Sequence, residues 1–154
     1  MRRFGRKPTN NKFGASQVEY KGIKFDSTYE RDRYIYLCHL QKQGKISGLR
    51  LQTPFLLITK TIKLIPRQLK TKVRWDKRVM EHEAMYHCDF CYLENGVYVC
   101  EEFKSQMTSK LADYILRRKL MIKKIYEHNA KGRGQWVFRE VIYYNKSKTT
   151  IEDK

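Results

Sequence analysis

The chain has 154 residues, of which 41% are hydrophobic and 13% aromatic, enough for the core of one domain and more than a disordered basic tail would carry. Its 33 Lys and Arg against 16 Asp and Glu give a formal net charge of +17, which favours a polyanionic partner over a merely solvated basic surface, nucleic acid before an anionic membrane. No stretch approaches the ~18 consecutive apolar residues of a membrane-spanning helix, and no apolar segment follows the charged start, so we expect a cytoplasmic protein with reduced cysteines.

The two ends of the chain differ in composition from its middle. Residues 1–18 are basic and rich in Asn and Gly, which predicts a flexible arm that lies along a phosphate backbone. Residues 145–154 are predicted to form a polar tail. Because no repeat or linker interrupts the remainder, residues 19–144 are expected to form one domain.

A helix is predicted to begin after Ser27 and to end near Gly44. Serine is a favourable N-cap, and glycine is common just beyond a helix C-terminus. Leu37 and Leu40 centre the apolar face of this helix. Three short segments rich in β-forming residues follow it, at 54–58, 62–65 and 73–79.

The strongest local signal is the dipeptide Asn95-Gly96, which lies between two β-rich runs, 86–93 and 97–104. Asn-Gly in this position is typical of a two-residue hairpin turn. The sequence therefore predicts a tight antiparallel hairpin with a fixed register.

Two further elements follow the hairpin, a helix over about 109–128 and a strand over 135–143. The helix carries apolar residues on one face and Lys and Arg on the other. The order of helix, strands, helix and strand predicts an α/β fold in which one mixed sheet is flanked by helices.

The predicted hairpin register brings acidic residues together. Counting outward from the turn places Asp89 opposite Glu102 at a non-hydrogen-bonded position, where facing Cα atoms lie about 4.5 Å apart. Lys104 projects from the same face as Glu102. Two facing carboxylates repel, and burial makes the repulsion more costly. A hard cation such as Mg²⁺ or Mn²⁺ would offset it and could activate water against a phosphate; ordinary alternating surface charges are the alternative.

In this setting, Asp89 followed across a hairpin by Glu102-Phe103-Lys104 resembles the signature of the PD-(D/E)XK nuclease superfamily. Cys88 stands where the motif's name has Pro, a position that is not a metal ligand. Within the superfamily, other segments resemble a small family of phage-encoded nucleases, and the resemblance covers about residues 18–128. These segments are 22–27 with Glu30, 44–46, 51–55 and 86–90.

The resemblance implies a restriction-endonuclease-like core and a set of site residues. Asp89, Glu102 and the main-chain carbonyl of Phe103 would bind the metal ion. Lys104 would assist the attacking water. Glu30, from the first helix, would complete the catalytic set.

Two interpretations of Glu30 remain open. Ser27 and Glu30 have the spacing of a capping box, in which the carboxylate bonds back to the Ser27 amide. However, Glu30 shares a helix face with Tyr34 and Leu37, so it lies on the inward side, where carboxylates are rare unless they are paired or functional.

The cysteines and histidines suggest a second metal hypothesis, because Cys88 and Cys91 have the spacing of zinc ligands. Residues three apart on a continuous strand point to opposite faces, so we expect that these two do not share an ion. Cys91 and Cys100 face each other in the predicted register, at a separation that a disulfide can span, but are expected to remain buried thiols. His87 alternates to the Asp89 face. The residues considered as ligands of this second metal ion are His82, His87, Cys88, Cys91 and Cys100.

Polar and basic residues that follow the hairpin are predicted to bind nucleic acid, with a solvated helix face as the alternative for any one of them. They are Gln106, Lys110, Arg117, Arg118 and Lys119.

The sequence thus predicts a divalent-metal-dependent endodeoxyribonuclease that acts on duplex or branched DNA. The resemblance implies phage replication, recombination or packaging in the host-cell cytoplasm. Because duplex cleavage needs two cuts, a homodimer is a candidate assembly. The alternatives are a non-catalytic nucleic-acid-binding protein on the same fold and an RNA-directed nuclease.

Overall fold

The computed structural model describes residues 17–132, 134–145 and 148–154. Of the flexible basic segment predicted at residues 1–18, residues 1–16 lie outside this part of the chain. The helices and strands, in chain order, are β1 (Val18–Tyr20), β2 (Ile23–Phe25), α1 (Thr28–Lys42), β3 (Ser47–Ile58), β4 (Thr61–Gln68), β5 (Val73–Glu81), β6 (Ala84–Glu94), β7 (Val97–Ser105), the 3₁₀ helix η1 (Thr108–Lys110), α2 (Ala112–Ala130), β8 (Trp136–Asn145) and β9 (Lys148–Asp153).

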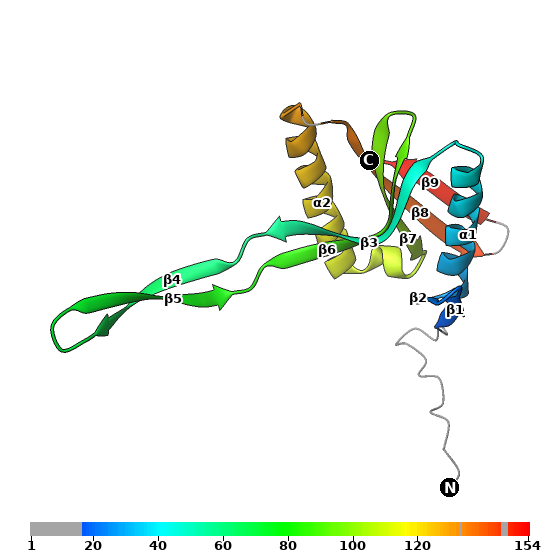
Figure 1. The fold of residues 1–154 in the computed structure, drawn as a ribbon. Helices are drawn as coiled ribbons and strands as arrows, with labels where there is room; N and C mark the ends of the chain where they lie inside the picture. The colour runs from blue at the N-terminus through cyan, green and yellow to red at the C-terminus, as the bar shows by residue number, and fades with distance from the viewer. Residues whose placement is uncertain (1–16, 133, 146–147) are drawn as a thin grey trace, which may run out of the picture.

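A five-stranded sheet in the order β3-β6-β7-β8-β9 forms the body of the protein. The sheet is mixed, because β7 and β8 run parallel and the other neighbours run antiparallel. Helix α1 and helix α2 lie on opposite sides of it (Figure 1). The predicted α/β class, with one mixed sheet flanked by helices, is confirmed, although strands make up more of the chain than the sequence indicated.

Each helix covers its own hydrophobic core. The α1-side core and the α2-side core share the central strands β6 and β7, whose side chains alternate between them. The α1-side core consists of Leu37, Ile46, Phe90, Tyr92 and Val99, and the α2-side core of Tyr86, Cys88, Cys91, Cys100, Met121, Ile125 and Phe138.

A buried ion pair holds α1 on the sheet. The guanidinium of Arg33 donates two hydrogen bonds to Glu101 of β7, Nε to Oε1 at 2.7 Å and Nη2 to Oε2 at 2.8 Å. The hydroxyl of Tyr92 donates to the same carboxylate at 2.6 Å. The fully buried Glu101 therefore has its charge satisfied within the fold, on the opposite face of β7 from Glu102.

Capping and turn residues in the sequence correctly predicted where several helices and strands begin or end. Ser27 caps α1, and Gly44 follows the helix with φ of 72°. Asn95 and Gly96 both have positive φ, 50° and 81°, as a type I′ turn between β6 and β7 requires. Helix α2 begins at Ala112, three residues after the predicted start, because η1 comes first.

The predicted polar tail at 145–154 was wrong for its second half, because Lys148–Asp153 form the edge strand β9 and pair with β8. The strand is exposed along its whole length, and its one large apolar residue is Ile151. Ion pairs hold it instead: Arg139 binds Asp153 at 2.6 Å, and Lys154 binds the buried Glu140 at 2.9 Å. An apolar pattern could not reveal a strand that is attached by hydrogen bonds and charges.

Strands β4 and β5 form a separate two-stranded sheet that projects from β3 and β6, away from the body (Figure 1). We call residues 61–81 the arm. The register groups most of the apolar side chains on one face and most of the basic ones on the other. One face carries Ile62, Leu64, Pro66, Val73, Trp75 and Val79 together with Lys77, and the other carries Lys63, Arg67, Arg74 and Arg78 together with Ile65 and Asp76. The sequence predicted these strands but not that they leave the main sheet.

Candidate active site

The predicted hairpin register is confirmed from Glu94 opposite Val97 to Phe90 opposite Glu101. The ladder ends there, so Asp89 and Glu102 do not form the expected facing pair. Instead, Asp89 Oδ2 accepts a hydrogen bond from the main-chain N–H of Phe103 at 2.9 Å. The carboxylate takes the place that a backbone carbonyl of β6 would occupy, and this fixes it against the edge of β7.

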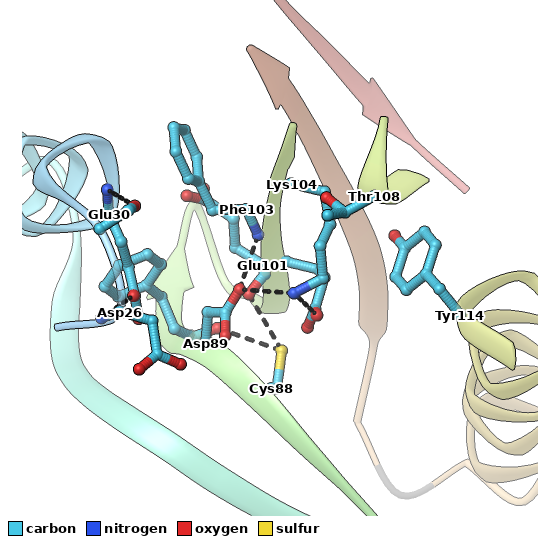
Figure 2. A network of polar contacts seen from close by, with 12 residues as sticks. Asp26, Glu30, Cys88, Asp89, Glu101, Phe103, Lys104, Thr108 and Tyr114 are labelled. Carbon is cyan, nitrogen blue, oxygen red and sulfur yellow. Dashed lines mark hydrogen bonds and ion pairs between the residues drawn. The ribbon is translucent and has the colours of Figure 1, made fainter. Parts of the chain in front are cut away.

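Lys104 joins the two carboxylates. Its Nζ lies 2.5 Å from Glu102 Oε1 and 3.5 Å from Asp89 Oδ2. Figure 2 shows the side chain of Lys104 pointing to Asp89 beside the Phe103 nitrogen. The three side chains thus converge as predicted. The ammonium group of Lys104 brings the two carboxylates together, and direct pairing of the strands does not.

The charges at this cluster are poorly balanced. Burial, and then the charge of Asp89, raise the pKa of Glu102 to about 7, against the opposing effect of Lys104. Burial alone would lower the pKa of Lys104, but the charges of Asp89 and Glu102 outweigh it and hold that pKa above its usual range. One ammonium therefore offsets two buried carboxylates only in part.

Two buried oxygens at the cluster lack a hydrogen bond of good geometry among the described residues. They are Glu102 Oε2 and the hydroxyl of Tyr86, which lie close enough to interact with each other. Buried polar atoms are almost always satisfied, so a buried carboxylate oxygen without such a bond beside a second carboxylate needs an explanation. Carboxylate oxygens are the ligand type that Mg²⁺ and Mn²⁺ accept.

Glu30 lies beside the same cluster. Its main-chain N–H is capped by Ser27 Oγ at 3.1 Å, as the capping-box pattern predicts. Its carboxylate, however, accepts from the Asp26 amide at 3.0 Å rather than from the amide of Ser27. Burial, and then the charge of Asp89, raise the pKa of Glu30 to about 7. The Ser27 half of the capping box is therefore present, the return bond of the carboxylate goes to Asp26, and the catalytic role of Glu30 stays a prediction.

Gln52 connects the carboxylates and was not among the predicted site residues. Its side-chain amide donates to Asp89 Oδ1 at 3.3 Å and to Glu30 Oε1 at 3.4 Å. Its φ is 46°, a left-handed conformation that is unfavourable for a residue with a Cβ. Gln52 falls in the segment 51–55 that the family resemblance included, but nothing in its residue type indicated a role.

Gln52 lies at a point where both β3 and β6 rotate, so that the side chains of each strand change from one face of the sheet to the other. On β6, Cys88 packs in the α2-side core and Phe90 in the α1-side core, although strict alternation would put them on one face. On β3, Leu51 and Phe55 differ in the same way. The pairing has one register on both sides of the Gln52 and Asp89 positions. The two strands therefore turn over together at the site.

This turnover overturns the argument that separated Cys88 from Cys91. The two residues are three apart, yet both lie in the α2-side core, because the strand changes face between them. With Cys100 they form a buried group. Cys91 and Cys100 face each other as predicted and are free thiols, with Sγ atoms 3.9 Å apart. The side chains of His82 and His87 are exposed.

Most of the predicted nucleic-acid-binding residues are exposed and follow the site along the chain: Gln106, Lys110, Arg117 and Lys119. Arg118 differs, because its Nη1 lies 2.6 Å from Oε1 of the buried Glu140, to which Tyr114 also donates. Arg118 therefore serves an internal ion pair. For Phe103 the structure gives the main-chain N–H a partner, and the role of its carbonyl as a metal ligand stays a prediction.

A comparison with protein families matches residues 10–145 to the family described as "Protein of unknown function (DUF1064)". The chain belongs to the DUF1064 family. The matched region contains Glu30, Gln52, Asp89, Glu102 and Lys104. No curated protein and no solved structure matches the chain significantly. Among the described residues of this DUF1064 protein, neither long helix is apolar enough to cross a membrane.

Proposed function

We propose that the protein is a divalent-metal-dependent endodeoxyribonuclease that hydrolyses phosphodiester bonds in duplex or branched DNA. The observation that carries this proposal is the convergence of two buried carboxylates, those of Asp89 and Glu102, on the single ammonium group of Lys104. The net charge of +17 supports nucleic acid as the substrate. The resemblance to PD-(D/E)XK nucleases supports a restriction-endonuclease-like core.

The carboxylates of Asp89 and Glu102 would hold Mg²⁺ or Mn²⁺, with the Phe103 carbonyl as a further ligand. When bound, the ion supplies Lewis-acid polarisation of the scissile phosphate and a coordinated water of lowered pKa. Positive charge at this point also opposes the two effects that raise the pKa of Glu102, which are burial and then the charge of Asp89.

The other residues of the cluster have roles that follow from their chemistry. Lys104 donates hydrogen bonds to the attacking water or to a phosphate oxygen that gains negative charge. Glu30, with a pKa of about 7, accepts a proton from water near neutral pH. Gln52 keeps the carboxylates of Glu30 and Asp89 at a fixed separation through its amide.

Phosphate contacts away from the reacting bond are assigned to exposed residues beside the site. Gln106, Lys110, Arg117 and Lys119 follow β7 and extend onto α2. Such contacts position a duplex without reading its sequence. Arg118 is left out of this set because Glu140 already binds its guanidinium.

The test is cleavage by the purified full chain. Supercoiled plasmid, linear duplex, a four-way junction and single-stranded RNA are each incubated with Mg²⁺, with Mn²⁺ or with EDTA. We expect metal-dependent cleavage of at least one DNA substrate. Asp89→Asn and Glu102→Gln are expected to lower the rate by roughly 100-fold or more, because each removes a proposed metal ligand.

The matched control is Glu127→Gln, which makes the same chemical change on the exposed face of α2. It should cleave at the wild-type rate. Cleavage that survives EDTA, or that Asp89→Asn retains in full, would contradict the proposal. Tight DNA binding without cleavage would favour the non-catalytic binder, and cleavage of RNA alone would favour the RNA-directed nuclease.

A further inference from the structure

Three cysteine thiols meet in the α2-side core, on the same face of β7 as Glu102. Cys88 and Cys91 come from β6 and Cys100 from β7, and their Sγ atoms all lie within 4.8 Å of one another. Their exposed fractions are 0%, 6% and 0%. The face exchange at Asp89 is what brings Cys88 to the side of the other two.

The spacing of the sulfur atoms suits a metal ion better than a disulfide. A Zn–S bond of about 2.3 Å in tetrahedral geometry places sulfur ligands about 3.8 Å apart. Cys91 and Cys100 are 3.9 Å apart, and the full set spans no more than 4.8 Å. A point central to three such atoms lies about 2.3 to 2.8 Å from each of them, so sub-ångström movements complete the coordination distances. A disulfide would need about 2.05 Å between two sulfurs and would leave the third unused.

A fourth ligand is available next to the thiols. Thr53 of β3 is the register partner of Cys88, and its buried Oγ1 lies close enough to the Cys91 thiol to interact with it. A pocket of about 430 Å³ is lined by Thr53, Arg50 and Cys91, which gives a route for an ion and space for a water ligand. The cationic Arg50 at this pocket would offset part of the negative charge of a thiolate cluster.

We propose that Cys88, Cys91 and Cys100 bind one soft, thiophilic metal ion of the Zn²⁺ class, with Thr53 Oγ1 or a water as the fourth ligand. Each thiol releases its proton to solvent as the metal–sulfur bond forms. The site is distinct in chemistry from the carboxylate cluster, because thiolates select Zn²⁺ over Mg²⁺ and Mn²⁺. Its structural effect is to tie β6 to β7 beside Asp89, and it does not depend on the proposed nuclease function.

The first experiment uses Co²⁺ as a spectroscopic substitute for Zn²⁺ in the reduced, metal-free full chain. Thiolate coordination gives a sulfur-to-cobalt charge-transfer band, and tetrahedral geometry gives strong visible bands. We expect both, saturating at one equivalent and bleached by Zn²⁺. The absence of a charge-transfer band in the wild-type protein overturns the proposal, whatever the variants do.

Variants then identify the ligands. Cys91→Ser and Cys100→Ser should each weaken Co²⁺ binding by roughly 100-fold or more, because a metal–thiolate bond is lost. The matched control is Cys38→Ser on α1, a cysteine outside the group, which should bind as the wild type does. Asp89→Asn should keep the cobalt spectrum, which separates this site from the carboxylate site. Dependence on Cys38, or an intact mass showing a disulfide and no metal in the isolated protein, would overturn the assignment.

Discussion

At the scale of single residues, the carboxylates of Glu102 and Glu30 decide how the metal-free protein responds to pH. Burial and the charge of Asp89 raise the pKa of each to about 7, from 4.5 for an unperturbed group. Between these two values the folded chain binds protons that the unfolded chain has lost. The stabilisation is complete below about pH 4.5 and disappears as the pH rises through about 7.

We therefore predict that, in EDTA, the wild-type protein loses unfolding free energy between about pH 5 and about pH 8, and that Glu102→Gln loses less. Glutamine is neutral throughout, so the cost of ionising a buried carboxylate at this position is absent. Urea denaturation at a series of pH values measures the slope. Glu127→Gln, on the exposed side of α2, should follow the wild type. Parallel curves for wild type and Glu102→Gln would contradict the account.

At the scale of elements, the site exists because two strands turn over at one point. Gln52 adopts a left-handed φ of 46°, which costs a residue with a Cβ on the order of 1 kcal/mol. The side chains at 51, 53, 55 and 57 remain partly buried through the turnover, and the even-numbered ones stay exposed. The alternation of exposed and half-buried positions along β3 is therefore unbroken in the sequence. The half-buried side chains nevertheless face one core before Gln52 and the other core after it.

A pair of variants tests the left-handed conformation of Gln52. Gln52→Gly and Gln52→Ala remove the same hydrogen bonds to Asp89 and Glu30, but only alanine keeps the unfavourable Cβ. We expect the glycine variant to be the more stable by about 1 kcal/mol, and both to have impaired cleavage. Chemical denaturation gives the difference. At an ordinary φ the alanine variant would be the more stable one, and that order would exclude the strained conformation.

The elements also show what the sequence could and could not predict. The turn at Asn95-Gly96 and the register beside it were predictable, because the backbone conformation that the turn needs is specified by two adjacent residues. The exact contacts of Asp89 were not, because they depend on the turnover with β3, which is distant in sequence. Strand β9 was missed because it is held by pairs such as Arg139 with Asp153 rather than by apolar burial. The grouping of three cysteines followed from the same unpredicted turnover.

At the scale of the whole molecule, the most distinctive feature is the arm of β4 and β5, which projects far from the body (Figure 1). Its basic face pairs Lys63 with Arg78 and Arg67 with Arg74 across the two strands. Like charges directly opposite each other destabilise a hairpin, and the proposed DNA substrate would offset that repulsion. Asp76, on the same face, forms ion pairs with Arg74 at 2.6 Å and with Arg67 at 3.9 Å, and the side chains of Lys63 and Arg78 are exposed.

We predict that the double variant Lys63→Gln and Arg78→Gln weakens DNA binding and lowers its salt dependence. For every phosphate that the arm no longer binds, the slope of log K against log salt concentration should fall in magnitude by about 0.9. Fluorescence anisotropy over a salt series measures both quantities. The matched control is Lys42→Gln with Lys45→Gln, two exposed lysines around the C-terminal end of α1, which removes the same charge. Equal effects of the two pairs would mean that only net charge matters and not the arm.

The most direct test of the central claim is a Mn²⁺ titration followed by electron paramagnetic resonance, which reports the free ion. The account predicts that the wild-type protein, at a pH above the pKa of Glu102, binds Mn²⁺. Asp89→Asn and Glu102→Gln should each lose this binding, while Glu127→Gln and Cys100→Ser keep it. Wild-type protein that leaves Mn²⁺ free, or a Glu102→Gln variant that binds it equally well, would contradict the claim that these two carboxylates form a metal site.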